Sequence, residues 1–170
     1  AGHVLLYKTE NFPFDWKIID TLIKNVTYTD TALLLSDNMN LISVSGKNLN
    51  QTLYCADILF GKLKTEKRFK NRVGDETRAG GNFFQIDGEL FLPLQKNNRG
   101  YGSGISIYKL NSEKNEIKLE KHIDAYLDKS DTIKWFNRGM HHLSVFSLND
   151  KIEIVFDGDI KNAYNEKDVN

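Results

Sequence analysis

Two aspartates and one arginine are the residues of this sequence best suited to acid–base chemistry or to binding an anion or hydroxyl groups. Asp30 and Asp75 are the best candidates for a carboxyl pair, and glycoside hydrolysis needs two such groups about 5 to 10 Å apart, one protonated as the acid and one ionised. Arg78 follows Asp75 closely. A guanidinium keeps its proton and cannot be the acid, but its planar fork of donors suits a phosphate, a carboxylate or sugar hydroxyls. An ion pair of Arg78 with Asp30 or Asp75 explains the arginine equally well.

Two adjacent histidines, His141 and His142, are the next candidates. Neighbouring residues of a regular strand point to opposite faces, so both rings cannot enter one site from β structure. We therefore expect neither a two-histidine metal centre nor a cofactor. His141 is a candidate general base or substrate-binding group, and a purely structural role is the alternative.

Polar and aromatic residues near strand ends could hold a polar ligand, of which a sugar is one example. Tyr101 lies in the glycine-rich stretch 100–104. A phosphate-binding loop is followed by a helix, but this stretch is followed by a predicted strand, so it is not such a loop. Tyr101 offers its ring and hydroxyl to a sugar instead. Gln95 could bind sugar hydroxyls or satisfy backbone groups. Trp135, in a loop, is a candidate for stacking on a sugar, whereas Trp16, in an alternating strand, is expected in the core.

The segment from Arg78 to Gly104 contains the strongest local signal. Two β-rich runs are joined by Asp87-Gly88, and an Asp-Gly pair between such runs predicts a two-residue hairpin turn, because both central residues need positive φ. Similar turns are expected near residues 37–38 and 149–150, so the turns recur about every 50 to 60 residues.

Four antiparallel strands repeated at that period are typical of a β-propeller blade. We predict one all-β domain, a partial propeller with a half blade (1–25), two blades (26–72 and 73–124), a half blade (139–158) and a polar tail (159–170). Because a propeller needs at least about four blades, the rest of a longer chain or a second chain would complete the ring.

Composition excludes several classes of function. The 170 residues include 23 basic and 23 acidic residues, so no overall field attracts nucleic acid, and we expect no nucleic-acid partner. No apolar run is long enough to span a bilayer, and we favour the cytoplasm. The single cysteine excludes an internal disulfide.

Short motifs follow one another in a fixed order between about Trp16 and Gly158. They are Leu53-Tyr54, Leu59-Phe60-Gly61, Asn71-Arg72-Val73, Asp75, Arg78, Gly80-Gly81, Asp87-Gly88, Pro93, Gln95, Tyr101-Gly102, Gly139, His141-His142 and Asp157-Gly158. This ordered set resembles the propeller domain of a glucosamine inositolphosphorylceramide transferase-like family. The resemblance implies a fold similar to the five-bladed propellers of glycoside hydrolase family 43, in a domain that accompanies sugar formyltransferases and glycosyltransferases. It also implies that an opening blade is missing, and with it any catalytic group that the hydrolases carry there.

The resemblance implies a carbohydrate-associated domain of a sugar-modifying transferase system. We expect recognition of a sugar or sugar-phosphate at the propeller axis by Arg78, Gln95, Tyr101 and His141, with Asp30 and Asp75 supporting, and no chemistry by this segment alone. A glycosidase of the family 43 type and a non-catalytic docking module are the alternatives.

Overall fold

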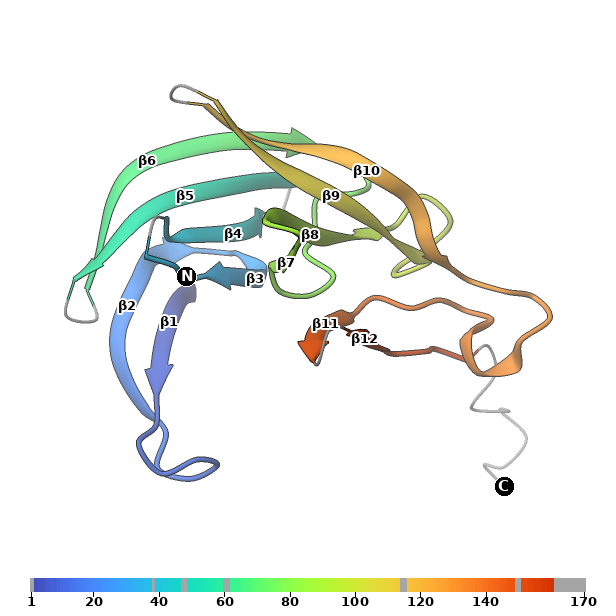
Figure 1. Cartoon of the computed structure of the whole chain (residues 1–170), viewed down its shortest axis with the longest axis horizontal. Coiled ribbons are helices and arrows are strands. Elements are labelled where there is room, and N and C mark those ends of the chain that lie inside the picture. Colours follow the sequence, from blue (N-terminus) through green and yellow to red (C-terminus); the bar gives the residue numbers. More distant parts are fainter. Residues whose placement is uncertain are drawn as a thin grey trace. The chain divides into compact units, whose positions relative to one another are not determined.

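β-Strands dominate the computed structural model, which describes residues 2–37, 39–46, 49–59, 62–113, 116–148 and 151–160, with the backbone alone for 56–59, 62–73, 113 and 148. Figure 1 shows them as antiparallel ribbons. The elements are β1 (Gly2–Lys8), β2 (Lys17–Val26), β3 (Thr29–Leu34), β4 (Leu41–Gly46), β5 (Asn50–Leu59), β6 (Lys62–Val73), β7 (Phe84–Ile86), β8 (Glu89–Lys96), β9 (Gly104–Glu113), β10 (Glu116–Asp128), a 3₁₀ helix (Lys134–Phe136), β11 (Leu143–Leu148) and β12 (Lys151–Phe156).

The chain divides into two compact units. The first comprises residues 1–79 and 112–118, and the second comprises residues 80–111 and 119–170. Within the first unit, β3, β4, β5 and β6 form an antiparallel sheet in that order, and β1 and β2 form a hairpin.

The hairpin of the first unit packs on the sheet through apolar side chains. Val4 lies in one buried cluster with Ile42, Val44 and Tyr54, and each of these residues is at most 9% exposed. Full burial of one such side chain stabilises a fold by about 1.5 to 3 kcal/mol. This cluster is therefore what holds a two-stranded hairpin, which is at best marginal alone.

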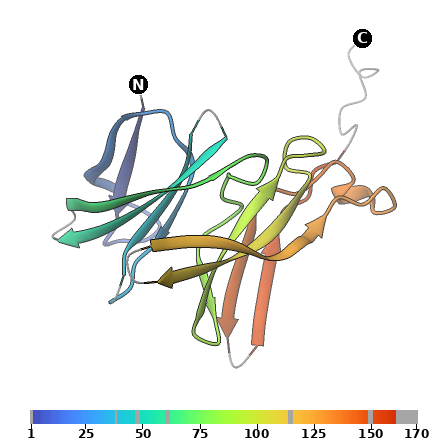
Figure 2. The same ribbon diagram turned by 90° about the horizontal axis from the view of Figure 1, so that it is seen from above.

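The second unit repeats this plan. Its sheet has the order β10-β9-β8-β7, and β11 and β12 form its hairpin. Figure 2 shows that hairpin, in orange and red, alongside the green and yellow strands of the sheet. Leu143 of the hairpin shares a buried cluster with Phe91, Ile105 and Ile107. Apolar burial thus joins a sheet to a hairpin in this unit too.

The central strand β4 shows how polar residues are accommodated inside the first unit. Residues 41–45 are all buried, so the serines of this strand need partners within the protein. Ser45 Oγ donates to the Thr77 carbonyl at 2.6 Å, and Gln51 Nε2 donates to Ser43 Oγ at 3.1 Å. The buried face of this strand can therefore contain serine without leaving these hydroxyls unsatisfied.

The predicted turn at Asp87-Gly88 is confirmed. Asp87 has φ 51° and Gly88 has φ 80°, and Ile86 pairs directly with Glu89 across the turn. Two central residues with positive φ match the twist of the flanking strands. The hairpin β7–β8 therefore forms where the dipeptide indicated.

The all-β prediction is confirmed, and the described strands form two four-stranded antiparallel sheets and two hairpins. None of these sheets closes on itself, and closure of blades into a ring stays a prediction. The predicted turns near 37–38 and 149–150 include Asn38, Asn149 and Asp150, which lie outside the described residues, as do residues 161–170 of the predicted tail. In the described part of the chain, no helix has the length and apolarity needed to cross a membrane.

Candidate functional site

Asp30 and Arg78, two of the predicted site residues, meet in the first unit. Arg78 Nε forms an ion pair with Asp30 Oδ2, and the two side chains are 25% and 24% exposed. Asp30 has φ 51°, and the β3–β4 register shifts between Thr29 and Ala32. The arrangement favours the ion-pair alternative for Arg78.

The backbone next to Arg78 is fixed by buried hydrogen bonds. Thr77 is fully buried, its carbonyl accepts from Ser45, and its Oγ1 donates to the Gly74 carbonyl at 3.1 Å. Asp75, by contrast, is exposed in the loop after β6. The segment thus presents Arg78 from a rigid support, while the predicted supporting role of Asp75 stays a prediction.

His141 and Asp157 form the best-defined polar pair of the second unit. His141 Nδ1 lies 2.7 Å from Asp157 Oδ2, and Asp157 Oδ1 accepts the backbone N–H groups of His141 and His142 at 2.9 and 2.8 Å. One carboxylate therefore holds both the ring and the backbone. With Nδ1 bound to the carboxylate, Nε2 is left as the acceptor of the neutral ring.

Tyr101 completes this group of side chains. Its ring meets the His141 ring edge to face, with centroids 5.6 Å apart, and Tyr101 is 56% exposed. The side chains of His141 and Asp157 are 39% and 34% exposed, and within the described part of the chain no group hydrogen-bonds Nε2 of His141. We call Tyr101, His141 and Asp157 the histidine site, a solvent-accessible group with an aromatic ring beside an oriented imidazole.

A tight loop between β8 and β9 positions Tyr101. Gly102 has φ 59°, and a Cβ on it would lie 2.8 Å from the His141 Cβ. The Gly102 N–H donates to Asn97 Oδ1 at 2.8 Å, and the Gly102 carbonyl accepts from the Met140 N–H at 2.7 Å. Because only glycine fits at this contact, the loop can bring Tyr101 against His141.

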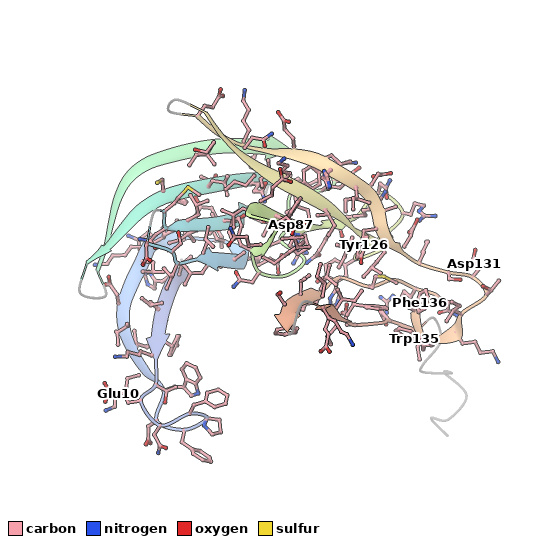
Figure 3. All side chains as sticks on the ribbon, in the orientation of Figure 1. Glu10, Asp87, Tyr126, Asp131, Trp135 and Phe136 are labelled. Carbon is pink, nitrogen blue, oxygen red and sulfur yellow. The ribbon has the colours of Figure 1, made fainter. Side chains whose placement is uncertain are left out.

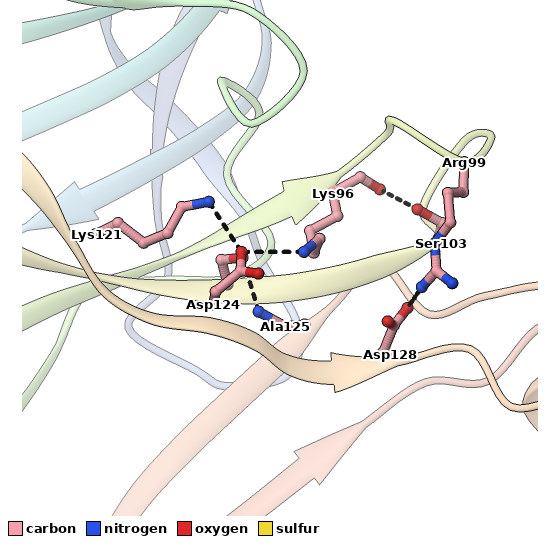
Figure 4. A network of polar contacts seen from close by, with 8 residues as sticks. Lys96, Arg99, Ser103, Lys121, Asp124, Ala125 and Asp128 are labelled. Atoms are coloured by element: carbon pink, nitrogen blue, oxygen red, sulfur yellow. Dashed lines mark hydrogen bonds and ion pairs between the residues drawn. The ribbon is translucent and has the colours of Figure 1, made fainter.

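An ion-pair network anchors the same loop to the sheet, as Figure 4 shows. Lys96, whose side chain is 8% exposed, places Nζ 3.0 Å from Asp124 Oδ1, and Lys121 Nζ lies 2.9 Å from the same atom. The hydrogen bond from Lys121 and then that from Lys96 lower the pKa of Asp124 to about 2. The Lys96 carbonyl also accepts the Ser103 N–H at 2.8 Å, which ties the network to the loop.

We expect Asp124→Asn to lower the free energy of unfolding by about 1 kcal/mol at pH 7, a modest value because the Asp124 side chain is 59% exposed. The native pKa is below the unfolded value, so this stabilisation is complete above about pH 4 and is lost as the pH falls toward 2. Urea unfolding between pH 7 and pH 2 should show the native chain and the variant converging. Glu153→Gln, at an exposed carboxylate of β12, is the control for removing one negative charge outside this network.

Gln95 and Trp135 occupy different surroundings from the histidine site. Gln95 is 4% exposed and lies against Gly80, where an added Cβ would be 3.5 Å from Gln95 Cγ. This burial favours the alternative in which the amide serves the interior. Trp135 is 49% exposed in the 3₁₀ helix and stacks on Phe156 at 5.6 Å and on the edge of Phe136 at 4.5 Å, and Figure 3 shows Trp135 and Phe136 close together.

The chain was compared with known protein families, curated proteins and solved structures. The family described as Glucosamine inositolphosphorylceramide transferase 1, N-terminal, matches residues 1–159. The chain belongs to this family. Neither curated proteins nor solved structures gave a match. The family match covers the Asp30–Arg78 pair and all three members of the histidine site, and it makes the chain part of a glycosyltransferase-related protein.

Asp157 is a residue of the histidine site to which the sequence pattern assigned no role. The two histidines precede β11 and share the Asp157 carboxylate through their backbone N–H groups. In the sequence, Asp157 stands out only as half of an Asp-Gly pair after a strand. Its partner, His141, lies 16 residues earlier in the chain. The available signal was the hairpin itself, which places an acidic residue after its second strand opposite a histidine before its first. Among the described residues, no cluster of three or more metal-ligating side chains occurs.

Proposed function

We propose that this family member is a carbohydrate-recognising domain of a glycosyltransferase-related protein, and that the histidine site binds the sugar. The observation that carries the proposal is an exposed tyrosine ring beside an imidazole that a carboxylate holds in one orientation. A sugar presents apolar C–H faces and hydroxyl groups together. An aromatic face and an oriented hydrogen-bonding group are the matching pair.

Each member of the site has a defined role in this proposal. Tyr101 provides the ring surface and a hydroxyl, and His141 accepts a sugar O–H at Nε2 because Asp157 holds Nδ1. Asp157 is a positioning residue. The role is recognition of the sugar, with no bond broken by this chain itself.

The family description indicates which sugar-bearing molecule to test. Inositolphosphorylceramide is named there as part of the transferase's identity. We propose that the ligand is a sugar or sugar-phosphate, with an inositol phosphate headgroup or a glucosamine-containing donor as the first choices. Arg78 is a second candidate for the phosphate, although its charge is matched by Asp30 in the first unit.

The proposal extends to the architecture. Each four-stranded antiparallel sheet has the strand order of a propeller blade, which supports a partial five-bladed propeller similar to those of glycoside hydrolase family 43. Completion of the ring would then need further chain or a second chain. A hydrolase of that family is less well supported, since Arg78 engages Asp30.

A thermal-shift screen of the purified chain tests the sugar proposal. The ligands are inositol phosphate, glucosamine, glucosamine phosphate and nucleotide sugars, and each tube is also checked for hydrolysis. A ligand at about 100 times its dissociation constant stabilises the folded chain by about 2.7 kcal/mol. We expect a shift with at least one ligand, which Tyr101→Ala and His141→Ala abolish.

Matched variants separate this site from the alternatives. Tyr126→Ala removes another exposed tyrosine of the second unit, 42% exposed, and should leave the shift unchanged. If Arg78→Ala abolishes the thermal shift and His141→Ala keeps it, the sugar site lies in the first unit, at Arg78. No shift with any ligand would favour the docking module, and turnover of a glycoside would favour the hydrolase.

A further inference from the structure

The end of the β1–β2 hairpin exposes three aromatic rings. Phe12 is 78% exposed, Phe14 is 65% exposed and Trp16 is 53% exposed. The sequence pattern predicted Trp16 in the core, and that prediction is wrong because Trp16 belongs to the turn rather than to β2, which begins at Lys17. We call residues 11–16 the aromatic turn. Figure 3 labels Glu10 beside it, at the far end of the hairpin. Clustered exposed apolar residues mark a surface for interaction.

The backbone of the aromatic turn is hydrogen-bonded within itself. The Phe14 N–H donates to the Asn11 carbonyl at 2.7 Å, and the Thr9 hydroxyl donates to the Phe14 carbonyl. The Asn11 N–H donates to the same hydroxyl at 3.1 Å. A segment that enters lipid must satisfy its backbone polar groups internally, and these groups of the turn already do so.

The one polar atom among the three ring systems is satisfied in the same way. Trp16 Nε1 donates to the Pro13 carbonyl at 2.9 Å, and the Trp16 and Phe12 rings meet edge to face with centroids 6.2 Å apart. Phe12, Pro13 and Phe14 have no polar side-chain atoms. The rings can therefore leave water without stranding a hydrogen-bond donor. A sugar site would instead present donors and acceptors beside the rings.

The four charged residues of the hairpin end balance one another, and one of them, Asp15, lies in the aromatic turn between Phe14 and Trp16. A hollow of about 300 Å³ is lined by polar and charged residues together with Ile19, and none of the three rings lines it. Lys8 and Glu10 lie 3.6 Å apart there. Two positive and two negative charges suit headgroups that carry both signs, rather than an anionic surface. The lining residues are Lys8, Glu10, Asn11, Asp15, Lys17 and Ile19.

We propose that the aromatic turn inserts into the headgroup region of a phospholipid bilayer with no net surface charge. Phenylalanine and tryptophan favour this depth, where one side of a segment is apolar and the other is wet. The inference goes beyond the sugar site and is carried by residues of the first unit alone.

Co-sedimentation of the full chain with phosphatidylcholine vesicles tests this proposal. We expect the native chain to bind and Phe12→Ser with Phe14→Ser to weaken the partition coefficient by about tenfold per ring. Phe146→Ser with Val155→Ser is the matched control, since Phe146 and Val155 are 55% and 63% exposed in the second unit. The control should bind as the native chain does. Absence of vesicle binding, or an equal loss in both double variants, would overturn the proposal.

Tryptophan fluorescence gives a second, site-specific measurement. The chain has two tryptophans, so Trp135→Phe leaves Trp16 as the only one. Its emission should shift to the blue on adding the vesicles, and the shift should persist at high salt and gain nothing from phosphatidylserine, because the local charges balance. An unshifted emission would overturn insertion. A second outcome would also overturn it: the native chain self-associates and does not bind vesicles, and the Phe12→Ser and Phe14→Ser variant no longer self-associates. The turn would then be a protein contact.

The sugar proposal and the membrane proposal can each be refuted without refuting the other. Soluble sugar phosphates in the thermal-shift screen probe the histidine site without a bilayer, and phosphatidylcholine carries no sugar. The Phe12→Ser and Phe14→Ser variant should keep its sugar response, and His141→Ala should keep its vesicle binding. Vesicle binding that depends on His141 would contradict the aromatic turn as the membrane contact.

Discussion

Asp157→Ala should lower the free energy of unfolding by about 2 kcal/mol and abolish the thermal shift produced by sugar ligands. The carboxylate accepts the N–H groups of both His141 and His142 and also holds His141 Nδ1. Its removal loses these three contacts, of which the bond to the His141 N–H is part-buried and that to the His142 N–H is exposed. A hydrogen bond contributes a net of about 0.5 to 1.5 kcal/mol. Urea unfolding measures the first effect, and the ligand screen measures the second.

Asp157→Asn separates the structural role of Asp157 from its role in orienting the ring. The amide oxygen can still accept both backbone N–H groups, so the unfolding free energy should stay within about 1 kcal/mol of the native value. The amide nitrogen, however, is a donor, and it would face Nδ1 of His141. We therefore expect the opposite ring tautomer, seen by nitrogen NMR, and weaker sugar binding. Unchanged sugar binding in Asp157→Ala would contradict the proposed site.

Local signals in the sequence were enough to predict the β7–β8 turn and the strands. Asp87-Gly88 has its own conformational preference, so the turn follows from two residues whatever the rest of the chain does. The buried runs in β4 and β8 are likewise read directly from their apolar residues. The fold class depends on such local terms, and it was predictable.

Contacts between distant residues were harder to predict. Arg78 and Asp30 are 48 residues apart in the sequence. Opposite charge alone made Asp30 and Asp75 equal candidates for the ion pair with Arg78. The hydrogen bonds from the His141 and His142 N–H groups to Asp157 could not be predicted either, because they join residues 16 and 15 positions apart in the sequence. The exposure of Trp16 depends on where the turn closes. The hydrogen bond from Trp16 Nε1 to the Pro13 carbonyl shows that Trp16 belongs to the turn. Each of these outcomes is decided by tertiary structure.

Gly102→Ala should be the more damaging of two alanine substitutions in the loop that positions Tyr101. The added Cβ would lie 2.8 Å from the His141 Cβ and 3.2 Å from its Cδ2, so the ring or the loop must move. We expect a loss of about 2 to 3 kcal/mol in unfolding free energy, from overpacking and from positive φ, together with loss of the sugar response.

Gly100→Ala is the matched control for this substitution. Gly100 also has positive φ, 113°, but nothing lies within 4 Å of its added Cβ, so alanine there strains the backbone without touching His141. Its unfolding free energy should fall while the sugar response remains at saturating ligand. If both variants keep the sugar response, then close contact between the loop and His141 is not needed for binding. If Gly102→Ala alone loses it, the position of the His141 ring against the loop determines recognition, because the two variants share backbone strain and differ in the clash.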